Sequence, residues 1–318
     1  QHLYVPSNVA RTDFTRFVVR SIEQSQIEWV RKVHLIVPDG AVPDGFKLPE
    51  LNLVPYSYLL PKEYLPTFNE QAIIWNLLKI PELTKKFIYV PMGTFLSDNF
   101  SPEELVDDKG KLVIEVRKHL KLKSHYESAM GISQHLVLEN KKNVSFEMFG
   151  PVLYDTQILK EVSNRYSKGV LSTTASKWES PKTLITSVVY RGHIMAQSSS
   201  DSEKYGYIIK PSNGWLVQWP GNKYDVTKAL DRVKKAHKMW FWIAPRVLGA
   251  RDPYTRKSLD SFLTSTYPIQ STLEIPAADY ERIGLYLGLA FILSFISFFY
   301  TCSAFMGVKR SKRERFST

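Results

Sequence analysis

Apolar and polar positions alternate with two different periods along the first ninety residues. From residue 14 to residue 32 the apolar side chains recur every three or four positions, with Arg and Glu between them, which predicts a helix. Residues 33–37 and 51–56 are short apolar runs, and Pro38-Asp39-Gly40 after the first is a turn sequence. Both runs are therefore predicted to be strands.

Two further elements complete this part of the pattern. Residues 67–80 predict a helix in which Thr67 is the N-cap and Glu70 completes a capping box. Residues 87–90 form the next predicted strand. Helix, strand, strand, helix and strand in this order predict an α/β fold whose crossovers build a mostly parallel sheet.

The pattern after residue 120 predicts mainly helices joined by polar loops. The predicted helices cover residues 125–140, 155–166, 183–197, 224–240 and 256–268. The run at 183–197 is also compatible with a buried strand, and 241–245 is predicted to be a short strand. Because no repeat or low-complexity linker divides the chain, we expect a single domain over residues 1–282.

The C-terminal region carries a long uncharged run. Residues 283–308 contain 26 residues without a charge, enough for a helix of about 39 Å, against about 30 Å of bilayer hydrocarbon. The tail at 309–318 holds five Lys or Arg and one Glu. By the positive-inside rule, we expect a transmembrane helix at 283–308 with a basic cytosolic tail. Residues 1–282 would then be luminal, in the Golgi or another secretory compartment.

Other features agree with a luminal domain. Asn99 and Asn143 each begin an Asn-X-Ser sequon, so both are candidate glycosylation sites. The single cysteine, Cys302, lies in the predicted membrane helix, so a disulfide or catalytic thiol within residues 1–282 is excluded. The chain begins at Gln1 without an apolar leader, which indicates processing or upstream sequence.

The positive charge of the chain does not indicate nucleic-acid binding. Of the formal net charge of +11, the last ten residues supply +4, and Lys and Glu are mixed along the rest. Zinc-ligand spacings and ribonucleoprotein motifs are absent from the sequence, so nucleic acid is not a predicted partner.

Residue types alone reveal little catalytic chemistry. The sequence contains no glycine-rich phosphate loop and no HExxH, GxSxG or HRD motif. His34 and His193 lie in apolar runs that favour structural roles, and Asp107-Asp108 lies in a turn that favours a solvated loop. The strand at 87–90 ends in Pro91-Met92-Gly93, although a phosphate site at a strand's carboxyl end would need oxygen ligands for a metal.

The order of motifs resembles that of the Stealth family of sugar-1-phosphate transferases. The motifs are "RFVVRSIEQSQIEWVRKVHLIVPDG", "LPTFNEQAI", "KFIYVPMGTF", "GPVLYDTQILKEV" and "LDSFLTSTYPIQSTLEIPAADYERI". The family includes bacterial capsule enzymes and the α/β subunit of lysosomal N-acetylglucosamine-1-phosphotransferase. The resemblance implies a glycosyltransferase-A-like α/β domain that uses Mg or Mn when it is active.

The resemblance also implies where the family's catalytic groups would lie. The family's Asn-Asp-Asp falls on Pro91, Met92 and Gly93, and its histidine falls on Phe149. Its second Asn-Asp falls on Ala244 and Pro245, and an acid of its first block falls on Arg11. Its Arg and Asp are absent from residues 177–183, and its first strand has no counterpart in the chain. The positions of the family's catalytic residues are therefore occupied by residues that neither carry protons nor bind metals.

Three functional hypotheses follow. The first is a degenerate transferase that acts as a partner or glycan-binding subunit without a cofactor. Loss of activity is expected because losing even one electrostatic group commonly reduces the rate by about 10²–10³. The second is an active (N-acetyl)hexosamine-1-phosphotransferase with a glycan or glycoprotein acceptor, Mg or Mn, and relocated acids at Asp13, Asp39, Asp44 or Asp155. The third is an unrelated membrane receptor or surface antigen.

Overall fold

The protein is described here by a computed structural model of the 318-residue chain. The structure describes residues 2–6, 12–25, 30–41, 46–47, 52–91, 93–117, 125–138, 145–200, 205–217, 223–236, 238–244, 247, 252–269, 271 and 274. The chain divides into two compact units, Gln1–Leu273 and Glu274–Thr318, and the first contains nearly all of the described residues.

A five-stranded sheet forms the centre of the first unit within the described residues. Its order is β3 (Asn52–Pro55), β2 (Lys32–Val37), β1 (His2–Pro6), β4 (Lys86–Tyr89) and β7 (Val152–Asp155). The first four strands are parallel to one another, and β7 runs antiparallel to β4. The α/β fold with a mostly parallel sheet is thereby confirmed.

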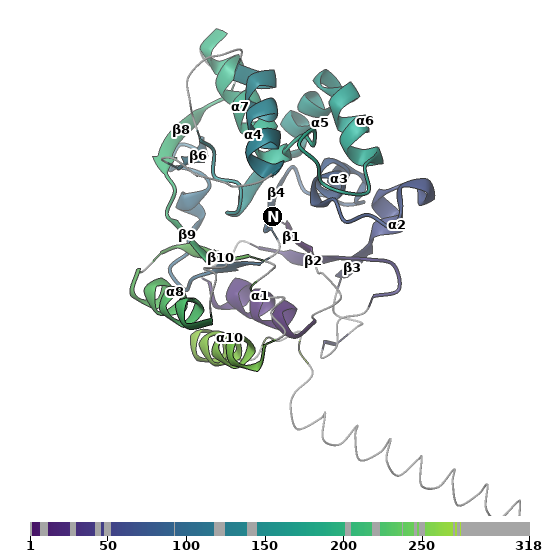
Figure 1. Ribbon diagram of the computed structural model, residues 1–318. Helices are drawn as coiled ribbons and strands as arrows, with labels where there is room; N and C mark the ends of the chain where they lie inside the picture. The colour runs from purple at the N-terminus through teal and green to yellow at the C-terminus, as the bar shows by residue number, and fades with distance from the viewer. Residues whose placement is uncertain are drawn as a thin grey trace, which may run out of the picture. The chain divides into compact units, whose positions relative to one another are not determined.

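Helices cover the central sheet on both sides (Figure 1). On one side lie α3 (Glu70–Trp75), α4 (His125–Leu138), α5 (Thr156–Arg165), α6 (Ser167–Ala175) and α7 (Thr186–Ser200). On the other side lie α1 (Thr12–Gln24), α8 (Lys223–Ala236) and α10 (Pro253–Thr266). A short helix, α2 (Tyr56–Leu59), follows β3 directly. Strands covered on both faces read as continuous apolar runs, as in Phe87–Val90, whose four side chains are all buried.

Two smaller sheets lie beside the central one. In the described chain, β5 (Thr94–Leu96), β10 (Trp240–Ile243) and β9 (Gly214–Val217) form one sheet, with β10 in the middle. A second pairs β6 (Leu112–Val116) with β8 (Tyr207–Pro211) in parallel. Because β5 follows β4 after only four residues, the chain passes from the central sheet to the β5-β10-β9 sheet at residues 90–93.

Trp240 packs between two glycine backbones and thereby fixes β10. Its side chain is almost fully buried. A Cβ atom at Gly214 would lie 2.2 Å from Trp240 Cζ2, and one at Gly150 would lie 2.5 Å from the same atom. Only glycine allows this close approach, which brings the backbone before β7 next to β10.

Three predicted helices are shorter in the structure, and one of them, predicted at 224–240, is α8, which ends at Ala236 before β10 begins at Trp240. The helix predicted at 14–32 ends at Gln24, and β2 already begins at Lys32. The hydroxyls of Ser21 and Ser25 donate to the carbonyls of Val18 and Ile22, a competing interaction that weakens a helix near its end.

The third corrected helix is the one predicted at 67–80. It is α3, which spans only Glu70–Trp75, and its N-cap is Asn69, whose side chain accepts bonds from the backbone N–H groups of Gln71 and Ala72. Thr67 is not the cap, because its hydroxyl accepts the Asn69 N–H. The capping box was therefore wrong, although the helix itself is present.

Most of the other predicted elements are confirmed. The run at 183–197 is helical, since α7 covers Thr186–Ser200, and the strands at 33–37, 51–56, 87–90 and 241–245 correspond to β2, β3, β4 and β10. The pattern did not predict β1, β5–β9 or α6, most of which are only three to five residues long. Short runs give too few positions for a period to be recognised.

No helix among the described residues is long and apolar enough to span a bilayer. The predicted membrane helix at 283–308 and the tail at 309–318 lie outside those residues, as does the boundary at residue 282. They stay predictions.

Candidate functional site

The topology of the central sheet indicates where a ligand would bind. From β1 the strand order runs through β2 to β3 on one side, whereas β4 lies on the other side of β1. The direction of winding therefore changes between β1 and β4. In open α/β sheets, ligands bind outside the carboxyl ends of the strands at such a switch point. Here that edge contains residues 90–93, which follow β4.

The chain beyond β4 is bonded to two distant segments. The backbone N–H of Ile243 in β10 donates to the carbonyl of Gly93 at 2.9 Å. The Thr94 hydroxyl donates to the carbonyl of Phe149 at 2.7 Å. The Phe149 ring stacks on Trp242, with centroids 4.1 Å apart and planes inclined by 26°. Segments near residues 93, 149 and 242 are thus brought together at the end of β4.

These three segments carry the positions that the Stealth resemblance assigns to catalysis. Pro91 and Gly93 are buried, Phe149 is partly buried, and Ala244 directly follows β10 and donates its N–H to the Val217 carbonyl. Met92, Pro245 and Arg11 lie outside the described residues. The described positions therefore lie in one region, and their side chains offer no proton carrier or metal ligand.

The two candidate relocated acids that the structure describes, Asp39 and Asp155, lie apart from each other. Asp155 lies opposite Lys86, at the amino end of β4, and its carboxylate caps α5 by accepting the Gln157 N–H at 2.9 Å. Asp39 follows β2 at the same sheet edge as Val90, where it accepts the Ser57 N–H at 3.2 Å. The side chains of Asp13 and Asp44 are outside the described set. Among the described residues, no three His, Cys, Asp or Glu side chains are grouped closely enough to hold a metal ion.

The buried carboxylate of Glu147 is hydrogen-bonded to the backbone of Phe149. Glu147 is fully buried, and its Oε2 accepts bonds from Arg117 Nε at 2.6 Å and from the Ser212 hydroxyl at 2.9 Å. Its Oε1 accepts the backbone N–H groups of Met148 and Phe149, each at 3.0 Å. Four hydrogen bonds therefore satisfy this charge and fix the backbone that presents Phe149 to Trp242.

Two more buried ionisable groups extend this network. Arg191 of α7, 4% exposed, donates through Nη1 to the Glu147 carbonyl. Glu115 of β6, also 4% exposed, accepts the Asn213 N–H at 3.2 Å. Burial raises the pKa of Glu115 to about 7, against the nearby positive charge of Arg191 and with the help of the negative charge of Glu147. This cluster was not predicted, because its members are far apart along the chain.

A carboxylate–tyrosine pair lies at the end of β4. The hydroxyl of Tyr89, the last residue of β4, donates to Glu70 Oε1 at 2.6 Å. Burial and the Glu70 charge raise the pKa of Tyr89 well above its usual value, and the same causes raise that of Tyr56 to about 12. Both phenols are therefore protonated at neutral pH. Glu70, predicted only as part of a cap, instead bonds Tyr89 beside the candidate site.

His34 and His193 have structural contacts, and the acid pair lies in a turn, as predicted. His34 bonds the side-chain amide of Asn52 on the neighbouring strand β3. The fully buried His193 lies 3.3 Å from Glu161, measured from Nε2 to Oε1. Asp107 closes a turn by accepting the N–H groups of Lys109 and Lys111.

The two sequons differ in what the structure shows. Asn99 is exposed in a turn after β5, a position that a glycan could occupy. Asn143 lies outside the described residues.

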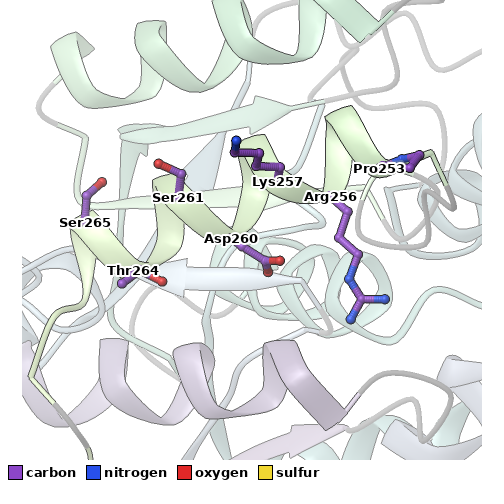
Figure 2. A pocket seen from close by; sticks show the side chains of 7 residues that line it. All are labelled: Pro253, Arg256, Lys257, Asp260, Ser261, Thr264 and Ser265. Atoms are coloured by element: carbon purple, nitrogen blue, oxygen red, sulfur yellow. The ribbon is translucent and has the colours of Figure 1, made fainter.

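A shallow depression of about 700 Å³ lies along α10, away from the switch point (Figure 2). All of its lining side chains belong to this one helix, including Arg256, Lys257 and Asp260. A single helix face does not bring groups from several elements together, so we do not assign the site there.

Comparison with known families identifies the region that forms this sheet edge. Residues 9–114 match the family model described as Stealth protein CR2, conserved region 2. This match covers one third of the chain and supports its membership of the Stealth family. The Stealth match includes α1, β2 to β5 and the 90–93 segment, whereas Phe149 and Ala244 lie outside it.

Curated relatives resemble a part of the chain of similar length. The capsular polysaccharide phosphotransferase LcbA of Neisseria meningitidis is 32% identical over 107 residues, which are 30% of this chain and 29% of that protein. The capsular polysaccharide phosphotransferase WcwK of Streptococcus pneumoniae is 30% identical over 95 residues, 29% of this chain and 28% of that protein. The chain thus spans less than a third of the length of these relatives.

One solved structure resembles the Stealth chain over most of its length. It is the galactosyltransferase LgtC in complex with donor and acceptor sugar analogues, at a TM-score of 0.46 and 10% identity. The match covers 87% of this chain and 98% of that one. Because this TM-score is low, the similarity does not assign a fold, and the glycosyltransferase-A-like fold stays a prediction.

Proposed function

We propose that this Stealth protein is a homologue of the sugar phosphotransferases that no longer transfers sugar phosphate and instead acts as a partner or glycan-binding subunit. The observation that carries the proposal is the Phe149–Trp242 stack beside Gly93. It lies at the switch point, where the resemblance places a histidine and acidic residues.

The physical argument concerns charge. Phosphoryl transfer depends on metal ions and basic groups that stabilise a charged transition state, and hard cations need oxygen ligands. The stacked rings present apolar surfaces, and the Thr94 hydroxyl already donates its proton to the Phe149 carbonyl. Asp155, one of the candidate acids, lies at the opposite end of β4 and caps a helix.

A second candidate function is transfer of an (N-acetyl)hexosamine 1-phosphate with Mg or Mn. It is favoured by the names of the relatives, which are phosphotransferases, and by the position of Asp39. Asp39 follows β2, two strands from β4, so its backbone lies roughly 10 Å from the end of β4 along the same edge.

A transfer assay decides between the two. The full chain, in detergent, is incubated with UDP-N-acetylglucosamine labelled at the β-phosphate, an α-linked mannose oligosaccharide acceptor, and Mg²⁺ or Mn²⁺. We expect no labelled product above a heat-denatured control. Labelled product that disappears in Asp39→Ala would refute the degenerate reading and support the active enzyme.

We also propose that the chain is anchored in a secretory membrane through residues 283–308, with the described domain in the lumen. The support is the uncharged run followed by five basic residues, together with the exposed sequon at Asn99. In sealed microsomes, we expect added protease to remove only the C-terminal tail. Digestion of the whole domain would overturn this orientation.

A further inference from the structure

Two large aromatic side chains are stacked on each other at the surface. Phe68 is 62% exposed and Trp178 is 64% exposed. Their ring centroids lie 4.3 Å apart, and the planes are inclined by only 11°. Since each ring covers one face of the other, much of the exposed area belongs to the remaining faces and edges.

The two loops that carry these rings are fastened together. The Phe68 N–H donates to the Lys177 carbonyl at 2.8 Å, and the Ser176 hydroxyl donates to the Trp178 carbonyl at 2.6 Å. The buried Asn69 side chain donates to the Ser176 carbonyl at 3.2 Å. The backbones under the rings are therefore positioned before any ligand arrives, which reduces the entropy lost on binding.

The stack lies near the candidate site. Phe68 is two residues before Glu70, whose carboxylate accepts the Tyr89 hydroxyl at the carboxyl end of β4. Trp178 belongs to residues 177–183, the segment from which the Arg and Asp of the Stealth resemblance are absent. The stack is thus connected to the end of β4 through Glu70.

The size and surroundings of the stack favour a small polar ligand over a protein. Aromatic side chains bury about 150–250 Å² each, so the exposed parts of these two rings offer roughly 200–300 Å² together. A standard protein interface buries about 800 Å² per partner, and its core is depleted of lysine. Here Lys177 and Lys182, both exposed, flank Trp178 along the chain.

We propose that the Phe68–Trp178 stack is a binding platform for a sugar ring of a glycan. The C–H face of a pyranose packs on an aromatic face, and the exposed Lys177 and Lys182 on the same loop are candidate donors to its hydroxyls. This proposal rests on the proposed function, because it assigns the glycan of that function to particular residues.

The test uses three defined probes: cellotetraose, chitotetraose and an α-linked mannotetraose. Their binding to the full chain is measured by calorimetry and by saturation-transfer NMR, for the wild type and for Phe68→Ala, Trp178→Ala and Trp178→Phe. Ile209→Ala, which removes a 49% exposed apolar side chain from β8, is the matched control. Thermal unfolding of each variant verifies that it is folded.

We expect at least one tetrasaccharide to bind with a millimolar Kd. Each Ala variant should weaken binding about tenfold, by analogy with nucleic-acid bases that stack on aromatic side chains. Trp178→Phe should remain within about threefold of the wild type, and Ile209→Ala should not differ from it. Absence of binding for all three probes, or equal binding by the Ala variants, would overturn the platform.

The platform and the proposed function fail in different ways. If the labelled transfer assay detects turnover, the degenerate reading is wrong, but the platform stands when Trp178→Ala lowers that turnover through the KM for the acceptor. If turnover is insensitive to Trp178→Ala, the platform is wrong and the enzyme reading stands. Sugar binding that depends on Trp178 without turnover supports both proposals.

Discussion

Replacing Glu147 with alanine tests whether the buried network holds the candidate site together. The substitution removes the acceptor of four hydrogen bonds and leaves the Arg117 guanidinium without its carboxylate. Breaking one side of a buried ion pair destabilises a protein by about 3–5 kcal/mol. Because the Arg117 side chain is 22% exposed, water compensates part of this loss, so we expect about 3 kcal/mol.

The expected change is large enough to measure by thermal unfolding. In domains of 150–250 residues, 1 kcal/mol shifts Tm by roughly 2–4 °C, and the shift is smaller in larger ones. We therefore expect Glu147→Ala to lower Tm by about 6 °C. The near-ultraviolet circular dichroism should also change, since the backbone of Phe149 loses a bond that orients its ring on Trp242.

Two comparisons make this prediction specific. Glu103→Ala, at an exposed glutamate, should leave Tm unchanged. The double variant Glu147→Ala/Arg117→Ala should lose less stability than the sum of the single variants, by about 0.5–3 kcal/mol. A Tm for Glu147→Ala within 2 °C of the wild type, or strict additivity, would show that the network does not stabilise this region.

Three further predictions concern stability and processing. Because the folded pKa of Glu115 is raised to about 7 by burial, its contribution to stability is intact below the unfolded pKa near 4.5 and decreases as pH rises to 7. Glu115→Gln should therefore remove roughly 3 kcal/mol of the stability difference between pH 5 and pH 8 in urea titrations, and an unchanged difference would contradict the assignment. Gly214→Ala places a Cβ 2.2 Å from Trp240 and should lower the free energy of unfolding by about 1–3 kcal/mol. The control Gly131→Ala in α4, whose Cβ would have no atom within 4 Å, should leave the free energy of unfolding unchanged or raise it by up to about 1 kcal/mol. Equal effects of the two variants would argue against the close packing at Gly214. Asn99→Gln should abolish one endoglycosidase-sensitive mobility shift in a secretory host, and an unaltered band pattern would place this sequon outside the lumen or leave it unused.

The fold was predictable where the chain repeats a pattern over many residues. The helices at 125–140, 155–166 and 256–268 have enough apolar positions for their period to be recognised, and the strand at 87–90 is an unbroken apolar run of four residues. The strand β1, five residues long, has few such positions, yet it lies at the centre of the sheet between β2 and β4. Its position depends on pairing with residues about thirty and eighty-five positions away, which local sequence does not encode.

The candidate site was predictable only through the order of motifs. The resemblance pointed to residues near 91–93, 149 and 244, and the structure places the described ones among them in one region. It could not show that Asp155 faces the other end of β4, since that follows from the antiparallel pairing of β7. The charges of Glu115 and Glu147 were missed because buried ionic residues look like surface ones in a single sequence.

The bond from Ile243 to Gly93 has a consequence for how such a site changes over time. It joins main-chain atoms, so the side chain of Ile243 takes no part in it, whereas Gly93 has a φ of +82°, a conformation that favours glycine. Exchanging the Ile243 side chain therefore leaves this link in place, whereas any side chain at residue 93 would strain the backbone that forms it.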